Sequence, residues 1–219
     1  RNTLMLAAIT LVLSVPLSLA LGVAAGLNEN KLPDILTSIV ALAVVGLPEV
    51  VTGLVLIQIF SRWLNLLPAN SSIRVDTTFA EALPMLILPA ITATLVLLAY
   101  IARMTRSGVA EELRKPYVRT ADLKGMPHRT VVGKHVLRNA LLPTITVIAI
   151  SFGWLIGGLI VIENVFNYPG LGRLLVFAID RRDLSLLQAI TMVIVLAFAL
   201  SNLAADLLYA YLNPRIRLQ

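Results

Sequence analysis

Five apolar runs, each about as long as a membrane-crossing helix, constrain the fold of this chain more than any other feature. An α-helix needs about 20 residues to cross roughly 30 Å of hydrocarbon. The runs are Leu4 to Gly26, Ile35 to Ser61, Ala82 to Ala102, Asn139 to Ile162, and Leu184 to Ala205 with a continuation toward Leu212. Backbone polar groups in hydrocarbon must be satisfied internally, so the runs predict helices. We expect an all-α integral membrane protein with one transmembrane domain over residues 1–219.

The composition supports lipid as the solvent of this chain. Hydrophobic residues make up 58% of it, charged residues only 14%, and the mean hydropathy is +0.87. The net charge of +6 is typical of a cytoplasmic membrane surface when the rest of a chain is this apolar, and no nucleic acid partner is expected. The chain has no cysteine, which excludes disulfides, thiolate metal sites and cysteine nucleophiles.

The distribution of basic residues predicts the orientation. Five crossings put the two ends of the chain on opposite sides, and one choice gives the inside segments twelve Lys/Arg and the outside segments six. Nine of the twelve lie between Arg103 and Arg138. By the positive-inside rule, this loop and the C-terminus are expected in the cytoplasm.

The same loop, 103–138, contains a bracketed short helix. Pro116 is suited to begin a helix, Gly125 to end it, and Pro127 to prevent its continuation, which predicts a helix from Tyr117 to Lys124. A second amphipathic helix is expected from Arg129 to Leu142, with Val132, Val136 and Leu137 facing inward and Lys134 and Arg138 in water. From the residues alone, the loop is either a rigid protrusion for a partner or a solvated basic segment on an anionic leaflet.

Three stretches of sequence resemble one family of transport proteins. The loop segment YVRTADLKGMPHRTVVGKHVLRNALLP, the segment FNYPGLGRLL from Phe166 and the segment NLAADLLYAYLNPRIR from Asn202 are similar to permease subunits of binding-protein-dependent ABC importers, in the peptide and nickel branch. The Glu-Ala-Ala positions of the family's loop motif fall on Arg119, Thr120 and Ala121, and its glycine on Gly125. Arg119 and Thr120 depart from the general motif but match the form of the peptide branch.

The resemblance implies a fold and a set of partners. The fold would be the helix bundle of a type I ABC importer permease, with five of six spans present and the first span missing. The partners would be two ATPase subunits, a second related permease, an extracytoplasmic solute-binding protein and membrane lipid, at the bacterial plasma (inner) membrane. The residues implied to dock on the ATPase are Tyr117, Val118, Arg119, Thr120, Ala121, Asp122, Leu123, Lys124, Gly125, Met126 and Pro127.

No enzymatic centre is expected in the chain itself. It contains no phosphate-cradling GxxxxGK[ST], no HExxH and no GxSxG, and His128 and His135 are too far apart in sequence for an i, i+4 metal pair. No catalytic, cofactor-binding or metal-ligating residue is therefore expected, and ATP and magnesium would bind the partner ATPase. The function implied is ATP-driven import of a small solute by alternating access, with di- or oligopeptides first and nickel, opines, glutathione or sugars as alternatives.

Charged and polar residues within or beside the spans are further candidates. Glu49 follows Pro48 inside the second run, near its middle, and intramembrane carboxylates are functional hypotheses by default. Glu163 and Asn164 end the fourth run on the outside. We consider Glu49 as a translocation path or gate residue, or as one that makes an interhelix hydrogen bond. Glu163 and Asn164 are considered structural or outer-gate residues, with cation binding as the alternative.

Two other features concern helix contacts and rival functions. Gly153 and Gly157 permit a close helix contact, either in a permease dimer or within the chain. Asn202 and Asp206 are four residues apart on one helix face and are expected to pair with loop arginines. An ion-coupled secondary transporter would need intramembrane carboxylates, of which only Glu49 is clearly deep. A membrane subunit without transport activity is the other rival.

Overall fold

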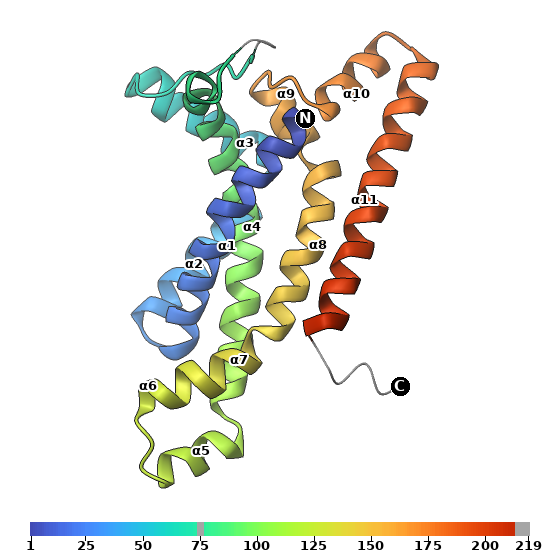
Figure 1. Ribbon diagram of the computed structural model, residues 1–219. Coiled ribbons are helices and arrows are strands. Elements are labelled where there is room, and N and C mark those ends of the chain that lie inside the picture. The colour runs from blue at the N-terminus through green and yellow to red at the C-terminus, as the bar shows by residue number, and fades with distance from the viewer. Residues whose placement is uncertain (74–76, 213–219) are drawn as a thin grey trace.

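The computed structural model describes residues 1–73 and 77–212, and every regular element within them is a helix (Figure 1). Three single helices are long and apolar enough to cross a membrane: α1 (Asn2–Leu27), α4 (Phe79–Leu113) and α11 (Leu184–Leu212). Two bent pairs raise the number of candidate spans to five, in line with the five apolar runs. Residues from 213 on, within the third family-like stretch, lie outside the described residues, as does Arg74.

The bent pairs and the short helices complete the chain. In the first pair, α2 (Leu32–Gly46) is followed by α3 (Glu49–Leu56) and the π-helix η1 (Ile57–Trp63). In the second, α6 (His128–Thr130), η2 (Val131–Val136) and α7 (Leu137–Ala140) are followed by α8 (Leu142–Gly158). The remaining helices are α5 (Pro116–Leu123), α9 (Ile160–Val165) and α10 (Leu171–Asp180).

The helices run between two ends of a bundle (Figure 1). We call the end that holds α5 to α7 and the turn between α1 and α2 the basic end. The opposite end holds the first residue of the chain, α9 and α10. Helices α1 and α4 both run from the opposite end to the basic end, whereas α8 runs back. The bent pair of α2 and α3 therefore returns the chain from the basic end to the start of α4.

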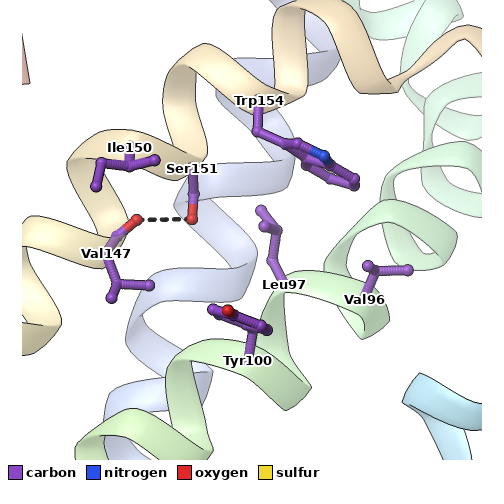
Figure 2. A pocket seen from close by; sticks show the side chains of 7 residues that line it. All are labelled: Val96, Leu97, Tyr100, Val147, Ile150, Ser151 and Trp154. Atoms are coloured by element: carbon purple, nitrogen blue, oxygen red, sulfur yellow. Dashed lines mark hydrogen bonds between the residues drawn. The ribbon is translucent and has the colours of Figure 1, made fainter. Parts of the chain in front are cut away.

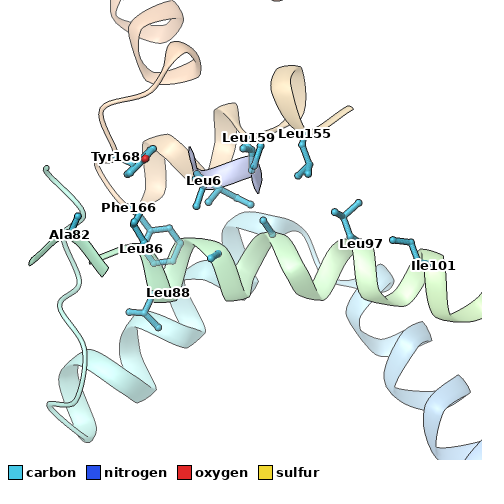
Figure 3. Packing of buried hydrophobic residues seen from close by; sticks show 14 residues of the cluster. Leu6, Ala82, Leu86, Leu88, Leu97, Ile101, Leu155, Leu159, Phe166 and Tyr168 are labelled. Atoms are coloured by element: carbon cyan, nitrogen blue, oxygen red, sulfur yellow. The ribbon is translucent and has the colours of Figure 1, made fainter. Parts of the chain in front are cut away.

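Helices α1 and α4 pack closely because small residues line their contact. An added Cβ at Gly22 would lie 2.5 Å from Thr105 Cβ, and one at Gly26 would lie 2.7 Å from Val109 Cβ. In lipid, helix association depends on van der Waals packing rather than on the hydrophobic effect, so such close backbone approach is a main source of stability. Figure 3 shows the buried cluster that extends this contact, in which Leu6, Leu97 and Phe166 take part.

Helix α4 is longer than its apolar run predicts. The run ends at Ala102, but the helix continues to Leu113 with Thr105, Val109 and Glu112 buried. These residues have the i, i+4, i+7 spacing of one helix face, so the helix continues without a break past the end of its apolar run. The first part of the predicted loop 103–138 is thus a helical extension.

The second apolar run is not one straight helix. Its two halves are bent by 105° at a break between Gly46 and Glu49, because Pro48 is the N-cap of α3 and cannot continue α2. Glu49 consequently lies in the first turn of a new helix. Counting residues along a continuous span, which placed Glu49 near the middle of the membrane, does not apply to it.

Helices α8 and α11 make the close contact that the glycines predicted, within one chain. An added Cβ at Gly153 would lie 3.1 Å from Asn202 Oδ1, and one at Gly157 would lie 3.6 Å from Ile194 Cγ2. Asn202 Oδ1 is buried and has no hydrogen-bond partner among the described residues. The expected pairing of Asn202 with loop arginines is therefore wrong, because its oxygen faces the backbone of α8. The side chain of Asp206, expected to pair in the same way, lies outside the described part of the chain.

Candidate docking site at the basic end

The short helix of the basic loop has defined ends. Pro116 occupies the first turn of α5, where its missing N–H costs nothing. At the other end, Gly125 adopts a left-handed backbone with φ of +75°. The N–H of Gly125 donates to the Asp122 carbonyl at 2.9 Å and that of Met126 to the Ala121 carbonyl at 3.2 Å. These two bonds are a Schellman motif, and the predicted glycine end of the helix is thereby observed.

One face of α5 is fixed on the helices that follow it. Val118 packs with Val131 and Val136 in a small buried cluster, and Tyr117, Ala121 and Met126 cover its edge. Val132 and Val136 are buried, as the amphipathic pattern of the second helix predicts. Val131, which that pattern missed, is fully buried as well. The π-helical turn of η2 explains the difference, because residues five apart in a π-helix, such as Val131 and Val136, lie on the same side.

A buried carboxylate joins α5 to the end of α4. Glu112 is 5% exposed, its Oε1 accepts a hydrogen bond of 2.9 Å from the Tyr117 hydroxyl, and its Oε2 forms an ion pair with Lys115. The hydrogen bond to Glu112 raises the pKa of Lys115, and burial raises the pKa of Tyr117. Both shifts favour the protonated side chains, which are the forms that bind the Glu112 carboxylate.

The opposite face of α5 is open. Leu123 is 81% exposed, and exposed polar residues surround it: Arg119, Thr120, Asp122 and Lys124. Gly125 and Pro127 at the end of the helix are exposed too. Of the eleven residues considered for docking, Tyr117, Val118, Ala121 and Met126 thus hold the helix in place, and the other seven form its accessible surface.

An ionic cluster at the basic end was not foreseen from the sequence. Arg106 donates two hydrogen bonds to the Asp34 carboxylate, at 2.9 and 2.7 Å, and Arg114 binds Glu29 at 2.7 Å. Asp34 is 4% exposed, and its Oδ2 also accepts the Asn30 N–H at 2.8 Å. The cluster ties the turn between α1 and α2 to the extension of α4. The sequence does contain a signal for this cluster. The short segment between the first two apolar runs carries two acids, Glu29 and Asp34, and is expected on the same side of the membrane as the strongly basic loop 103–138.

At the opposite end of the bundle, Glu163 lies in a buried hydrogen-bond network. Its carboxylate accepts bonds from the Thr3 hydroxyl at 2.7 Å, from the Gly172 N–H at 2.6 Å and from the Arg173 N–H at 3.2 Å. The last two N–H groups belong to the first turn of α10, where a carboxylate is favoured by the helix dipole. Glu163 thus links the start of α1 to α10. Within the described ranges, the Asn164 side chain donates only to the Ile160 carbonyl of its own helix, at 3.3 Å.

Glu49 is not brought together with Glu163 or with the docking surface. Its side chain is half-buried in the first turn of α3. Among the described residues, it forms no ion pair within 4.0 Å and no side-chain hydrogen bond. The part of the chain that the structure describes also contains no group of three or more His, Asp or Glu side chains placed to hold a metal ion.

Comparison with known proteins defines the class to which this fold belongs. A solved structure described as an amino acid ABC transporter with histidines superimposes with a TM-score of 0.69, at 15% sequence identity, over 97% of this chain and 90% of that one. The fold is therefore that of a type I ABC importer permease. The family model for the inner membrane component of binding-protein-dependent transport systems matches residues 18–218.

Curated relatives lead to the same family at higher identity. The glutathione transport system permease protein GsiC of Salmonella typhimurium strain LT2 is 41% identical over 215 residues. That of Escherichia coli strain K12 is 40% identical over the same length. Each alignment covers 98% of this chain and 68% of the relative. The chain belongs to the family of binding-protein-dependent transport system inner membrane components, in the peptide and nickel branch.

Proposed function

We propose that this chain forms half of the translocation pore of an ATP-driven importer, and that α5 docks on an ATPase subunit in the cytoplasm. The observation that carries the docking role is the two-sided character of α5. One face is fixed by Val118 and by the Glu112 contacts, and the other presents Leu123 at 81% exposure within a charged rim. An apolar centre with a polar rim is typical of a protein interface.

The movement of α5 would be passed on through α4. Tyr117 and Lys115 bind the buried Glu112 of α4, so a displacement of α5 displaces the end of that helix. When ATP brings two ATPase subunits together, the docked helices of two permeases would approach each other and the bundle would open to the outside. The second permease and the solute-binding protein belong to this proposal, as does the cytoplasmic position of the basic end, which the excess of Lys and Arg supports.

The solute we propose is glutathione or another small peptide. The relatives at 40 to 41% identity are named as glutathione transport permeases, and glutathione is itself a tripeptide. This choice takes up one of the alternatives that the branch left open, beside di- and oligopeptides. Binding measurements with the solute-binding protein that accompanies this permease would decide between glutathione and dipeptides.

Uptake into proteoliposomes by the reconstituted complex tests the transport and docking roles together. Gly125→Arg places a long side chain at a left-handed backbone position on the docking surface, and should abolish ATP-dependent uptake and retention of the ATPase. Gly133→Arg is the matched control in the same loop, because Gly133 is exposed with open space around its Cβ position and no left-handed backbone.

Glu49→Gln distinguishes ATP coupling from ion coupling. In an importer driven by ATP, this variant keeps ATP-dependent uptake, since the energy enters through α5. Uptake that ignores ATP, follows an ion gradient and disappears in Glu49→Gln would overturn the proposal. A membrane subunit without transport activity would give no uptake with any variant.

A further inference from the structure

Two adjoining cavities flank α4 and share one residue. The first, of about 490 Å³, lies between α4 and α8, and Leu97, Tyr100, Ser151 and Trp154 are among its lining residues (Figure 2). The second, of about 550 Å³, is lined by Ser38 of α2 and by Tyr100, Arg103, Met104, Arg106 and Ser107 of α4. Tyr100 lines both and is 67% exposed. The cavities therefore adjoin along one helix.

The α4 residues that line the two cavities form one continuous face. Val96, Tyr100, Arg103 and Ser107 follow each other at spacings of three and four residues, which places them on one side of a helix. We call this face, with the α2 and α8 residues beside it, the α4 groove. It begins at the apolar Val96 and Leu97 and ends at Ser107, beyond the apolar run that stops at Ala102. A molecule in it would pass from an apolar environment to a polar one toward the basic end.

The polar end of the groove carries an arginine that has no partner. Among the described residues, Arg103 makes no ion pair and no hydrogen bond, although it lies three residues from Arg106. Arg106 is held by Asp34 and Arg114 by Glu29. Arg103 is thus the free cation of the groove. Ser38, Tyr100 and Ser107 line the same cavity, and of these the Ser38 hydroxyl already donates to Asp34, at 3.4 Å. A carboxylate is the group that this combination would bind best.

A third cavity, on another side of α4, has no charged side chain among its lining residues. It has about 610 Å³, lies between α1 and α4 and includes Val12, Leu13, Leu95 and Leu98. Its one hydroxyl, that of Thr94, is directed to the Thr10 carbonyl of α1 at 3.5 Å. That surface suits the acyl chains of lipid. The two sides of α4 therefore differ in chemistry, although both are open.

We propose that the α4 groove is the inner part of the path taken by the solute, and that Arg103 binds a carboxylate of that solute. The class of solute is then an anionic, peptide-like molecule, whose body passes Tyr100 and Trp154 and whose carboxylate reaches Arg103. This inference rests on the proposed importer function and adds to it a binding residue and a charge requirement. The second permease would close the open side of the groove.

The absence of cysteine from the whole chain permits a direct test by thiol labelling. Ser107→Cys puts a thiol beside Arg103, and Ser72→Cys, at an exposed position in the loop before α4, is the matched control away from the groove. In the reconstituted complex, with any partner cysteines replaced, we compare the rates of an anionic and a cationic methanethiosulfonate reagent, each divided by the rate of the same reagent with a small free thiol. A charged groove concentrates counter-ions on the order of 10-fold, and we expect the anionic reagent to be favoured by about that factor at residue 107 and not at residue 72.

The arginine is then varied in the Ser107→Cys background. Arg103→Gln should remove the preference for the anionic reagent and Arg103→Lys should keep it, while the thermal unfolding midpoint reports whether each variant folds. Two results with Ser107→Cys and Arg103 retained would overturn the inference. One is equal rates for both reagents, and the other is no reaction at residue 107 from either side of the membrane. The preference for the anionic reagent could instead change with the anionic lipid content of the proteoliposomes and not with added solute. That result would also overturn the inference, in favour of a lipid headgroup as the ligand.

Solute protection separates this inference from the proposed function. S-methylglutathione, which has two carboxylates and no free thiol, should slow labelling at residue 107 during turnover, and Arg103→Gln should reduce its uptake per ATP hydrolysed. ATP-driven uptake without protection or an Arg103 effect would refute the groove and leave the importer. Protection and charge preference without any ATP-driven uptake would refute the importer and leave the groove.

Discussion

At the scale of single residues, glycines mark the places where this fold has no room for a side chain. An added Cβ at Gly170 would lie 1.9 Å from Glu163 Oε1, inside the buried network that links α1 and α10. Gly46 has no atom within 4 Å of its Cβ position. In the sequence Gly170 and Gly46 look alike, because both lie in or beside apolar segments. They differ in the structure, where the Glu163 carboxylate occupies the space next to Gly170.

The pair gives a prediction for stability. Gly170→Ala forces the Glu163 carboxylate away from the first turn of α10 and should cost about 1–3 kcal/mol, the usual cost of overpacking. The purified complex in detergent should then unfold at a lower temperature. Gly46→Ala should leave the midpoint unchanged or raise it, because alanine favours a helix. Equal midpoints for the two variants would show that the network around Glu163 yields without cost.

Gly125 gives a prediction for coupling. Its φ of +75° costs a residue with a Cβ about 1–2 kcal/mol, so Gly125→Ala should loosen the end of α5 and lower the uptake per ATP hydrolysed. Gly125→Asn should retain more coupling, since asparagine tolerates a left-handed backbone. If alanine and asparagine behave alike, the left-handed end of α5 is not what coupling requires.

At the scale of elements, the bidentate contact between Arg106 and Asp34 fixes α2 against α4. A hydrogen bond to a charged group is worth about 1.5–3 kcal/mol, so Asp34→Asn and Arg106→Gln should each lower the unfolding midpoint. The double variant should be less destabilised than the sum of the two, as a double-mutant cycle on thermal unfolding would show. Additive effects would mean that the two helices are held by other contacts.

The same elements show what the sequence could predict. Apolar runs locate α1, α4, α8 and α11 because the membrane imposes a minimum length, and the Pro116–Gly125 bracket locates α5 because both ends depend on local backbone chemistry. The runs did not reveal that α4 continues beyond Ala102, since its extension is held by buried side chains rather than by lipid.

Other features depend on the fold as a whole. Pro48 marks the break before Glu49 in the sequence, but the angle of 105° is known only from the folded chain. The Arg106–Asp34 pair joins residues 72 positions apart. For the candidate docking site, the sequence predicts the helix but not which of its faces is buried and which is exposed. The faces are defined by Val131, whose inward position depends on a π-helical turn that no hydrophobic pattern marks.

At the scale of the whole molecule, the contacts join α1, α2, α4 and α5 into one mechanical unit. Gly22 and Gly26 bring α1 against α4, Asp34 holds α2 on α4, and Glu112 holds α5. Helix α11 has no ion pair to this unit among the described residues and packs mainly on α8 and α10. A pull on α5 should therefore move the unit as a rigid body rather than bend it.

Spin-label distances in the reconstituted complex test this rigid-body movement. Labels at Glu111→Cys at the end of α4 and Lys31→Cys in the turn before α2, both exposed sites outside the proposed docking surface, should keep the same mean distance with and without ATP. Labels at Glu111→Cys and Leu196→Cys on α11 should change their distance, because α11 lies outside the unit. Asp34→Asn should broaden the first distribution, since it releases α2 from α4. A first distance that changes with ATP in the unmodified protein would show that the basic end deforms internally, and that force reaches the bundle by a route other than α4.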